Sequence, residues 1–300
     1  MLHVRPEISE VVGKSILITG VARSGTTIMG TLVHTLESVE FIFEPLLLYG
    51  LFPLLGEMDP KTWKFLYETY LVEDVLADSL AGRRLNFNRY DISSIREVKS
   101  IQDVDARLDS RYRRLDLFRE VCNHRVAYKM PDVLPYLSRL LELYPNMSVV
   151  VMFREPEAVA ESLLDRQWFS GHNRISDTIQ GPWISLSPDV PFWTPEKERD
   201  SWGQASPLEK SYLYYCWQNE ALLALDRKRL CVVDYDRFVD DPVQQFNEVM
   251  RYVGGKPGSK TESVLQSVIL KREVVRASLG DIAPELRERV LKILDSMGCL

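Results

Sequence analysis

Short apolar runs alternate with segments of helical periodicity along most of the chain. Five runs are nearly continuous in hydrophobic character and are predicted to be strands: Ser15–Val21, Val39–Phe43, Arg125–Met130, Ser148–Phe153 and Leu230–Asp234. Strands that are covered on both faces have this composition. Apolar residues at positions i, i+3 and i+4 predict helices at Thr26–Leu36, Asp132–Leu143, Glu157–Leu164, Leu208–Leu225 and Val243–Val253.

This alternation predicts an α/β fold of three layers, similar to P-loop proteins, with a central parallel sheet of about five strands flanked by helices. In such folds, ligands bind at the carboxyl ends of the strands. Pro131, Pro156 and Pro242 stand where helices are expected to begin, and Gly254 stands where one is expected to end. We find no linker and no internal repeat, so we expect residues 1–300 to form one domain.

Two segments interrupt the alternation. Residues 46–110 are expected to form a mostly helical insertion, in which Lys61–Leu80 is the clearest helix. Residues 168–202 contain four prolines and four tryptophans without a steady period. A loop of this length is more often a lid or binding loop than a simple connection. A surface loop held in place by its tryptophans is the alternative.

Composition narrows the classes of function. The chain has 300 residues and a net charge of −6, which argues against a general binder of nucleic acids or anionic membranes. A local basic pocket for one anion remains compatible with that charge. The four cysteines have no metal-ligand spacing, so no metal site is predicted. No apolar stretch approaches the ~20 residues of a membrane span, and Met1–Lys14 lacks the apolar core of a signal peptide. We therefore expect a cytoplasmic protein, and the sequence leaves homo-oligomers open.

The segment Gly20–Thr27, with the sequence GVARSGTT, lies between the first strand and an amphipathic helix. Its glycines let the backbone curl so that successive N–H groups point inward, and the helix N-terminus adds positive potential. Its arginine and hydroxyl side chains add further donors. The alternative is a strand-to-helix turn with a threonine cap. The predicted phosphate-binding residues are Arg23, Ser24, Gly25, Thr26 and Thr27.

The loop differs from that of nucleoside triphosphatases, G-x-x-x-x-G-K-[ST]. Gly20 and Gly25 match its glycines, but Thr26 occupies the lysine position. That lysine bridges the β- and γ-phosphates. A ligand with a single phosphate at its 5′ end would not need it.

A second motif ends the fourth predicted strand. In the sequence VVVMFREP, Arg154 stands at the carboxyl end of the strand and a helix is expected to begin at Pro156. Ser162 follows eight residues after the arginine, on that helix. Arg154 could clamp a phosphate through two hydrogen bonds, and Ser162 could add a hydroxyl.

Together, the two motifs resemble those of the PAPS-dependent sulfotransferase family. The 5′-phosphosulfate loop of that family typically reads R-S-G-T-T, and its 3′-phosphate motif is a strand ending R-x-P with a serine eight residues beyond the arginine. Lys129–Pro131 is similar to its K-x-P segment. Val232–Pro242 is similar to V-x-Y-E-x-L-x-x-x-P, with Asp236 and Phe238 in place of Glu and Leu. The resemblance covers residues 15–253 except for the two insertions.

The resemblance implies 3′-phosphoadenosine-5′-phosphosulfate (PAPS) as the sulfuryl donor, adenosine 3′,5′-bisphosphate (PAP) as the product, and no metal requirement. Arg23–Thr27 would hold the 5′-phosphosulfate, and Arg154 with Ser162 the 3′-phosphate. The acceptor would be a small molecule or a glycan with a free hydroxyl. The phenol and steroid branch has K-S-G-T in this loop, so Arg23 favours a carbohydrate-like branch. A lipid-like or aromatic alcohol remains open.

Glu44 is the candidate general base, because it follows the second strand in the sequence FIFEP and emerges at the same edge as the phosphate loop. Apolar neighbours would raise its pKa and strengthen it as a base. The carbohydrate and tyrosyl-protein branches place a catalytic Glu in a similar setting. The alternative is a strand-end carboxylate paired with an arginine. Arg23 and Lys129 complete the predicted catalytic set, with Lys129 neutralising the leaving group unless it is a solvated lysine at a strand end.

Other charged residues have weaker support. His172 and Arg174, in the tryptophan-rich loop, are candidates for contact with the acceptor, whereas His34 is expected to be packed or exposed. A basic C-terminal segment, Lys271–Arg276, lacks the R-K-G of the family and is expected to be a solvated helix face. Two rival functions remain. A nucleotide kinase or NTPase would use Leu230–Asp234 as a strand with a magnesium-binding aspartate, and a non-catalytic scaffold would keep the loops without turnover.

Overall fold

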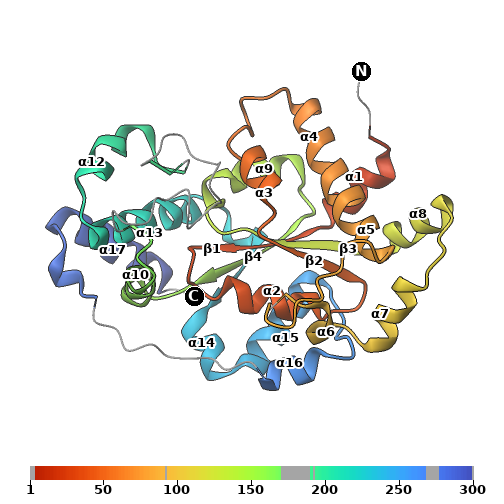
Figure 1. The fold of residues 1–300 in the computed structure, drawn as a ribbon. Coiled ribbons are helices and arrows are strands. Elements are labelled where there is room, and N and C mark those ends of the chain that lie inside the picture. Colours follow the sequence, from red (N-terminus) through yellow and green to blue (C-terminus); the bar gives the residue numbers. More distant parts are fainter. Residues whose placement is uncertain (1–3, 92, 170–189, 192, 268–276, 299–300) are drawn as a thin grey trace.

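The computed structural model describes residues 4–91, 93–169, 190–191, 193–267 and 277–298. Within these ranges, five parallel strands form one sheet in the order β2-β3-β1-β4-β5 (Figure 1). The strands are β1 (Ile16–Gly20), β2 (Val39–Phe43), β3 (Arg125–Lys129), β4 (Ser148–Phe153) and β5 (Leu230–Asp234). Each predicted strand is present and helices flank the sheet, so the predicted fold class is confirmed.

The helices before β4 are α1 (Pro6–Gly13), α2 (Thr26–His34), α3 (Leu46–Leu51), α4 (Pro60–Thr69), η1 (Tyr70–Ala77), α5 (Asp78–Leu80), α6 (Ile95–Val98), α7 (Ile101–Leu108), α8 (Arg114–Asn123), η2 (Leu134–Tyr136) and α9 (Leu137–Leu143). Those after β4 are α10 (Pro156–Asp165), η3 (Glu196–Glu198), α12 (Arg199–Gln204), α13 (Pro207–Leu223), η4 (Arg227–Arg229), α14 (Tyr235–Asp240), α15 (Pro242–Val253), α16 (Thr261–Ser267), η5 (Leu279–Asp281) and α17 (Pro284–Met297). None of these described helices combines the length and apolar character needed to cross a membrane.

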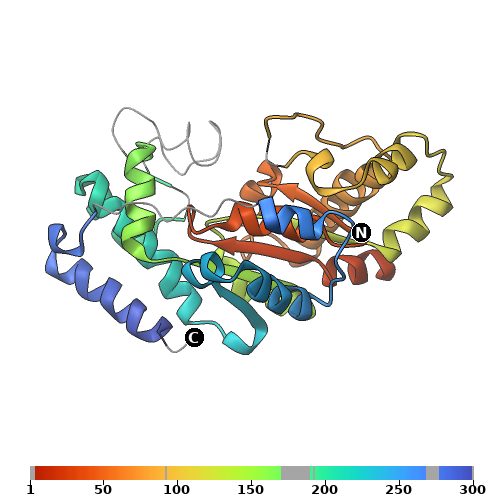
Figure 2. The same ribbon diagram turned by 90° about the horizontal axis from the view of Figure 1, so that it is seen from below.

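Two hydrophobic cores, one on each face of the sheet, produce the three layers. Successive side chains of a strand point to opposite faces, so Leu17 of β1 joins one core while Ile16 and Ile18 join the other. The first core also contains residues of α1, η1, α9, α13 and α17, and the second those of α2, α14 and α15. Figure 1 shows α4 and α9 on one side of the sheet and α2 and α15 on the other. Figure 2 shows α8 (yellow) and α17 (blue) at opposite ends of the molecule.

The helix boundaries follow the prolines and glycines in most places. Pro156 and Pro242 begin α10 and α15, and Gly254, with a φ of +63°, ends α15 in the left-handed conformation that glycine tolerates. The prediction of a helix from Asp132 was wrong at its start. Asp132 has a φ of +70°, which is incompatible with a helix, so helical structure begins at Leu134.

The described residues of 46–110 include α3 to α7, in agreement with the predicted helical character. The helix predicted at 61–80 is present as α4, η1 and α5 in succession, and its middle, Tyr70–Ala77, is wound as a π-helix. Segments of π-helix are rare and occur frequently at functional sites.

The described ends of the 168–202 segment pack on α13 through aromatic rings. Phe169 lies 6.0 Å from Tyr214, and Trp193 lies 4.8 Å from Tyr214 and 5.8 Å from Trp217, measured between ring centroids. Such contacts fit the alternative of a loop held by its tryptophans at its two ends. Whether residues 170–189 act as a lid stays a prediction, because they lie outside the described part of the chain.

Candidate active site

The carboxyl ends of β2, β3, β1 and β4 meet at one edge of the sheet. In the strand register, Lys129 at the end of β3 is opposite Phe43 of β2 on one side and Ile18 of β1 on the other. On the far side of β1, Gly20 is opposite Met152 of β4. The loops that follow these strands therefore bring the predicted site residues together, although they are far apart in sequence.

The loop between β1 and α2 is curled tightly around its glycine. Arg23 and Gly25 have φ values of +73° and +93°. A Cβ atom at Gly25 would lie 2.5 Å from the ring of Tyr235, so no larger residue fits there without displacing that ring. Gly25 is also the N-cap of α2 and offers no side-chain cap. The first N–H groups of α2 have no acceptor within the helix and can bind an anion.

Hydrogen bonds brace this loop from behind. The hydroxyl of Ser24 is fully buried and donates to the carbonyl oxygen of Val21 at 2.6 Å. The N–H of Ala22 donates to the hydroxyl of Tyr214 at 2.6 Å, and Tyr214 donates to the carboxylate of Asp132. Burial raises the pKa of Tyr214, with a further contribution from Asp132, so the hydroxyl keeps its proton. Ser24 therefore shapes the loop, and its side chain does not line the cavity described next.

A cavity of about 400 Å³ opens above the loop. The predicted site residues that line it are Arg23, Gly25, Thr26, Thr27, Glu44, Lys129 and Arg154. Seven further residues line it, and three of them that sequence reasoning did not nominate can make polar or stacking contacts: Asp132, Trp168 and Tyr235. Asp132 directly follows the family-like segment Lys129–Pro131, and Tyr235 lies within the family-like segment Val232–Pro242. Their positions in the sequence could therefore have marked both as candidates.

Glu44, Lys129 and Thr27 form one polar cluster in this cavity. The ammonium group of Lys129 donates to the Glu44 carboxylate and, at 3.0 Å, to the Thr27 hydroxyl. It also lies 4.1 Å from the centre of the Phe43 ring. Burial lowers the pKa of Lys129, and the negative charge of Glu44 partly opposes that change. Glu44 thus pairs with a lysine. The alternative interpretation of Glu44, a strand-end carboxylate paired with an arginine, predicted a different partner.

The two predicted phosphate motifs contact each other through Arg23. Its Nε atom donates to the Ser162 hydroxyl at 3.0 Å, and its carbonyl oxygen accepts from Nη1 of Arg154 at 3.0 Å. The Arg154 guanidinium lies 4.4 Å from the ring centre of Tyr235, and the residue as a whole is 6% exposed. The hydroxyl of Tyr215 donates to the Arg154 carbonyl at 3.1 Å, which fixes the strand end.

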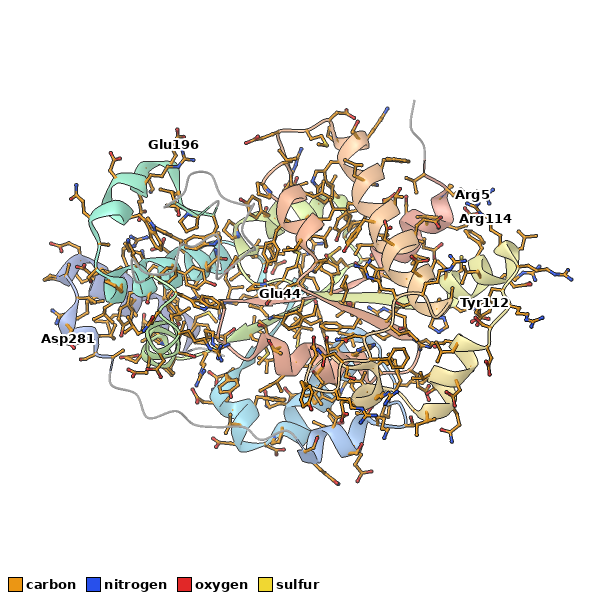
Figure 3. The ribbon with its side chains drawn as sticks, viewed as in Figure 1. Arg5, Glu44, Tyr112, Arg114, Glu196 and Asp281 are labelled. Carbon is orange, nitrogen blue, oxygen red and sulfur yellow. The ribbon has the colours of Figure 1, made fainter. Side chains whose placement is uncertain are left out.

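A second cavity, of about 720 Å³, adjoins the first. Phe43 and Glu44 line both, so the Glu44 carboxylate stands at their boundary. Figure 3 shows Glu44 near the middle of the molecule. Most of the walls of the larger cavity come from β2, α3, η1 and the segment that follows α5, with single residues from α2, α5 and α6.

Three remaining predictions concern charged residues elsewhere. His172, Arg174 and residues 271–276 lie outside the described residues.

Among the described residues, no group of His, Cys, Asp and Glu side chains could hold a metal ion. Asp234, the aspartate that a phosphotransferase would use, accepts a hydrogen bond at 2.9 Å from the Arg237 N–H and caps α14.

Comparisons with known proteins bear on the fold and on the family. Solved structures similar to the chain include sulfotransferase STF9 from Mycobacterium avium, at 13% identity and a TM-score of 0.50, over 97% of this chain and 79% of that one. The sulfotransferase domain of the Synechococcus olefin synthase has 13% identity and a TM-score of 0.48, over 95% and 94%. At this identity, the likeness to STF9 bears on the fold alone. No match was found among curated proteins.

The family comparison is more informative. A family model described as "Sulfotransferase family" matches residues 15–256 of the chain. The matched range begins just before β1 and includes the whole sheet and both phosphate motifs. It therefore contains every described residue that we assign to the site, and the chain belongs to the sulfotransferase family.

Proposed function

We propose that the protein transfers the sulfuryl group of PAPS to a hydroxyl of its acceptor, with Glu44 as the general base. One observation carries the proposal. Glu44 stands at the boundary of two cavities and is held by Lys129, which also contacts Thr27 at the start of α2. A base in this place can meet a nucleotide on one side and an acceptor on the other.

The smaller cavity fits the nucleotide. The curled loop and the N-terminus of α2 supply N–H donors for the 5′-phosphosulfate, and Arg23 supplies a guanidinium. Arg154 and Ser162 are proposed for the 3′-phosphate. Arg23 and Arg154 both line this cavity and contact each other, which supports a basic wall with partners for both phosphates of PAP. Ser162 does not line the cavity and accepts a hydrogen bond from Arg23.

The chemistry follows from these positions. The acceptor oxygen forms a bond to sulfur while the bond between sulfur and the bridging oxygen of the 5′-phosphate breaks. The acceptor proton passes to Glu44. Lys129 and Arg23 offset the negative charge that develops on the departing phosphate and on the sulfuryl oxygens. Lys129 is 4% exposed, and a positive charge acts more strongly where water is excluded.

The rival functions have less support. Thr26 stands where a phosphotransferase would carry its lysine, and Asp234 is occupied in capping α14. A scaffold without turnover would have no use for a base and a lysine at the boundary of two cavities. By resemblance, Arg23 favours a sugar acceptor, whereas the walls of the larger cavity favour an apolar one.

The decisive experiment measures PAP by chromatography after incubation with PAPS and a panel of hydroxyl acceptors. Release of PAP that depends on an acceptor would support sulfuryl transfer. Turnover of ATP with absolute dependence on Mg²⁺ would assign a phosphotransferase instead. Tight PAP binding without turnover of any acceptor would assign the scaffold.

A further inference from the structure

The larger cavity runs along β2, which is an edge strand of the sheet. Four consecutive residues of this strand, from Glu40 to Phe43, line it together with Glu44. At about 3.3 Å per residue, the path from Glu40 to Glu44 is roughly 13 Å long. A molecule that fills this cavity and presents its hydroxyl to Glu44 is therefore elongated.

The walls next to Glu44 are apolar and open to solvent. Phe43, Leu46 and Leu47 line the cavity with 37%, 41% and 49% of their surface exposed. Large apolar side chains gathered at the mouth of a site gain free energy when a ligand covers them. Sugar hydroxyls would find no hydrogen-bond partner on these three side chains. The body of the acceptor that passes them is therefore apolar.

The two carboxylates of the cavity are already neutralised. Glu44 is paired with Lys129. Glu40 accepts two hydrogen bonds of 2.7 Å from the guanidinium of Arg107. Neither carboxylate is left to balance a further positive charge in the walls.

Two arginines add such positive charge. Arg84 donates to the carbonyl oxygen of Asp74 at 2.8 Å and lies 5.9 Å from the Tyr70 ring centre. In the described part of the chain, no carboxylate lies within ion-pair distance of Arg84. Its neighbour Arg83 contacts Asp78 at 3.3 Å in an exposed pair, which is weak. Both arginines line the cavity, so its charge complements an anion.

A buried histidine also lines the cavity without a partner. His34 is 4% exposed, and neither ring nitrogen has a hydrogen-bond partner among the described residues. Burial lowers the pKa of His34 well below its usual 6.5, so the imidazole is neutral and the positive charge of the cavity comes from its arginines.

We infer that the acceptor is an elongated alcohol with an apolar body and an acidic group. Its hydroxyl meets Glu44, its body covers Phe43, Leu46 and Leu47, and its acidic group pairs with Arg84. This inference rests on the proposed sulfotransferase function and specifies its acceptor.

The test uses three probes on the full chain: ω-hydroxydecanoate, decanol and glucose. Release of PAP gives kcat/KM for each, and calorimetry gives binding to the PAP-loaded protein. We expect ω-hydroxydecanoate to exceed decanol by about two- to fivefold, the effect of an ion pair with an exposed arginine. Glucose should be the poorest of the three.

Variants locate the effect. Arg84→Gln should abolish the advantage of ω-hydroxydecanoate over decanol, and Arg84→Lys should retain much of it. Arg89→Gln is the matched control, since Arg89 is exposed and does not line the cavity. Leu47→Gln should weaken binding of both aliphatic probes and leave PAP binding unchanged.

The outcomes separate the inference from the function on which it rests. Equal kcat/KM for ω-hydroxydecanoate and decanol, or an advantage that survives in Arg84→Gln, would overturn the inference that the acceptor carries an acidic group. A preference for glucose would overturn the inference that the body of the acceptor is apolar. In each case, release of PAP would leave the sulfotransferase function standing. Failure of PAP to bind, and of every probe to release it, would instead remove the function itself.

Discussion

Lys129, the last residue of β3, donates to the carboxylate of Glu44, which follows the neighbouring strand β2. The same ammonium group donates to Thr27 at the start of α2. The proposed base, the proposed counter-charge and the phosphate loop are thus one connected unit.

The first prediction concerns the base. Glu44→Gln keeps the shape of the side chain and removes its ability to take a proton, so turnover should fall by ~10²–10⁴. PAP affinity should be almost unchanged, because the residues proposed to bind its phosphates are intact. Rapid-quench measurement of single turnovers isolates the chemical step, and exposed Glu288→Gln on α17 is the control. Near-wild-type single turnovers would refute the role of Glu44.

The second prediction concerns pH and Lys129. Burial lowers the pKa of Lys129 from its usual 10.5, so its positive charge is lost at a lower pH than that of an exposed lysine. If the charge assists the leaving group, kcat should decline on the alkaline side as pH rises through that lowered pKa. Lys129→Arg should move the decline to higher pH, since arginine stays protonated. Lys129→Met should reduce turnover throughout. An alkaline limb that does not move in Lys129→Arg would contradict the assignment.

The third prediction concerns the 3′-phosphate. PAP should bind much more tightly than AMP, which lacks that group. Arg154→Ala should cost about 2–5 kcal/mol of PAP binding, as for removal of one partner of a buried charged pair. AMP binding should change little. Calorimetry with both nucleotides measures the difference, and Arg139→Ala, exposed on α9, is the control. Equal affinities for PAP and AMP in the wild type would remove the motif from the nucleotide site.

The fourth prediction concerns the curl of the phosphate loop. Gly25→Ala places a methyl group 2.5 Å from the Tyr235 ring at a φ of +93°, so the loop must open. PAP affinity should fall by at least about tenfold, since strain at such positions costs of order 1–3 kcal/mol. Gly50→Ala is the matched control, because nothing lies within 4 Å of a Cβ atom there. Equal PAP affinity in both variants would show that the curl is not needed for binding.

The fifth prediction concerns metal. PAPS has no triphosphate, and the loop has Thr26 in place of the lysine. Turnover should therefore persist in EDTA at an unchanged rate, measured as PAP release. Loss of turnover on chelation, with recovery on adding Mg²⁺, would indicate that the protein is a phosphotransferase.

Local features of the sequence were sufficient for the strands and for the tight turn that follows β1. A strand covered on both faces needs a continuous apolar run, which is visible without knowledge of its partners. The glycines of the loop are likewise a local requirement, because φ values of +138° and +93° at Gly20 and Gly25 suit no other residue well. The start of the helix after β3 could not be predicted from the local sequence. Asp132 is held in a left-handed conformation while it accepts a hydrogen bond from Tyr214, which lies more than eighty residues away.

The pairing of the site residues depended on tertiary structure. The sequence by itself placed Glu44 and Lys129 at strand ends, which determined that both would reach the carboxyl edge. Only the strand order put β2 beside β3, and only the register put Phe43 opposite Lys129, so that Glu44 meets that lysine. The larger cavity was likewise undetermined, since its walls come mostly from β2, α3, η1 and the segment after α5. Hydrophobic pattern specifies which residues are buried, whereas contacts between distant segments depend on how the whole core packs.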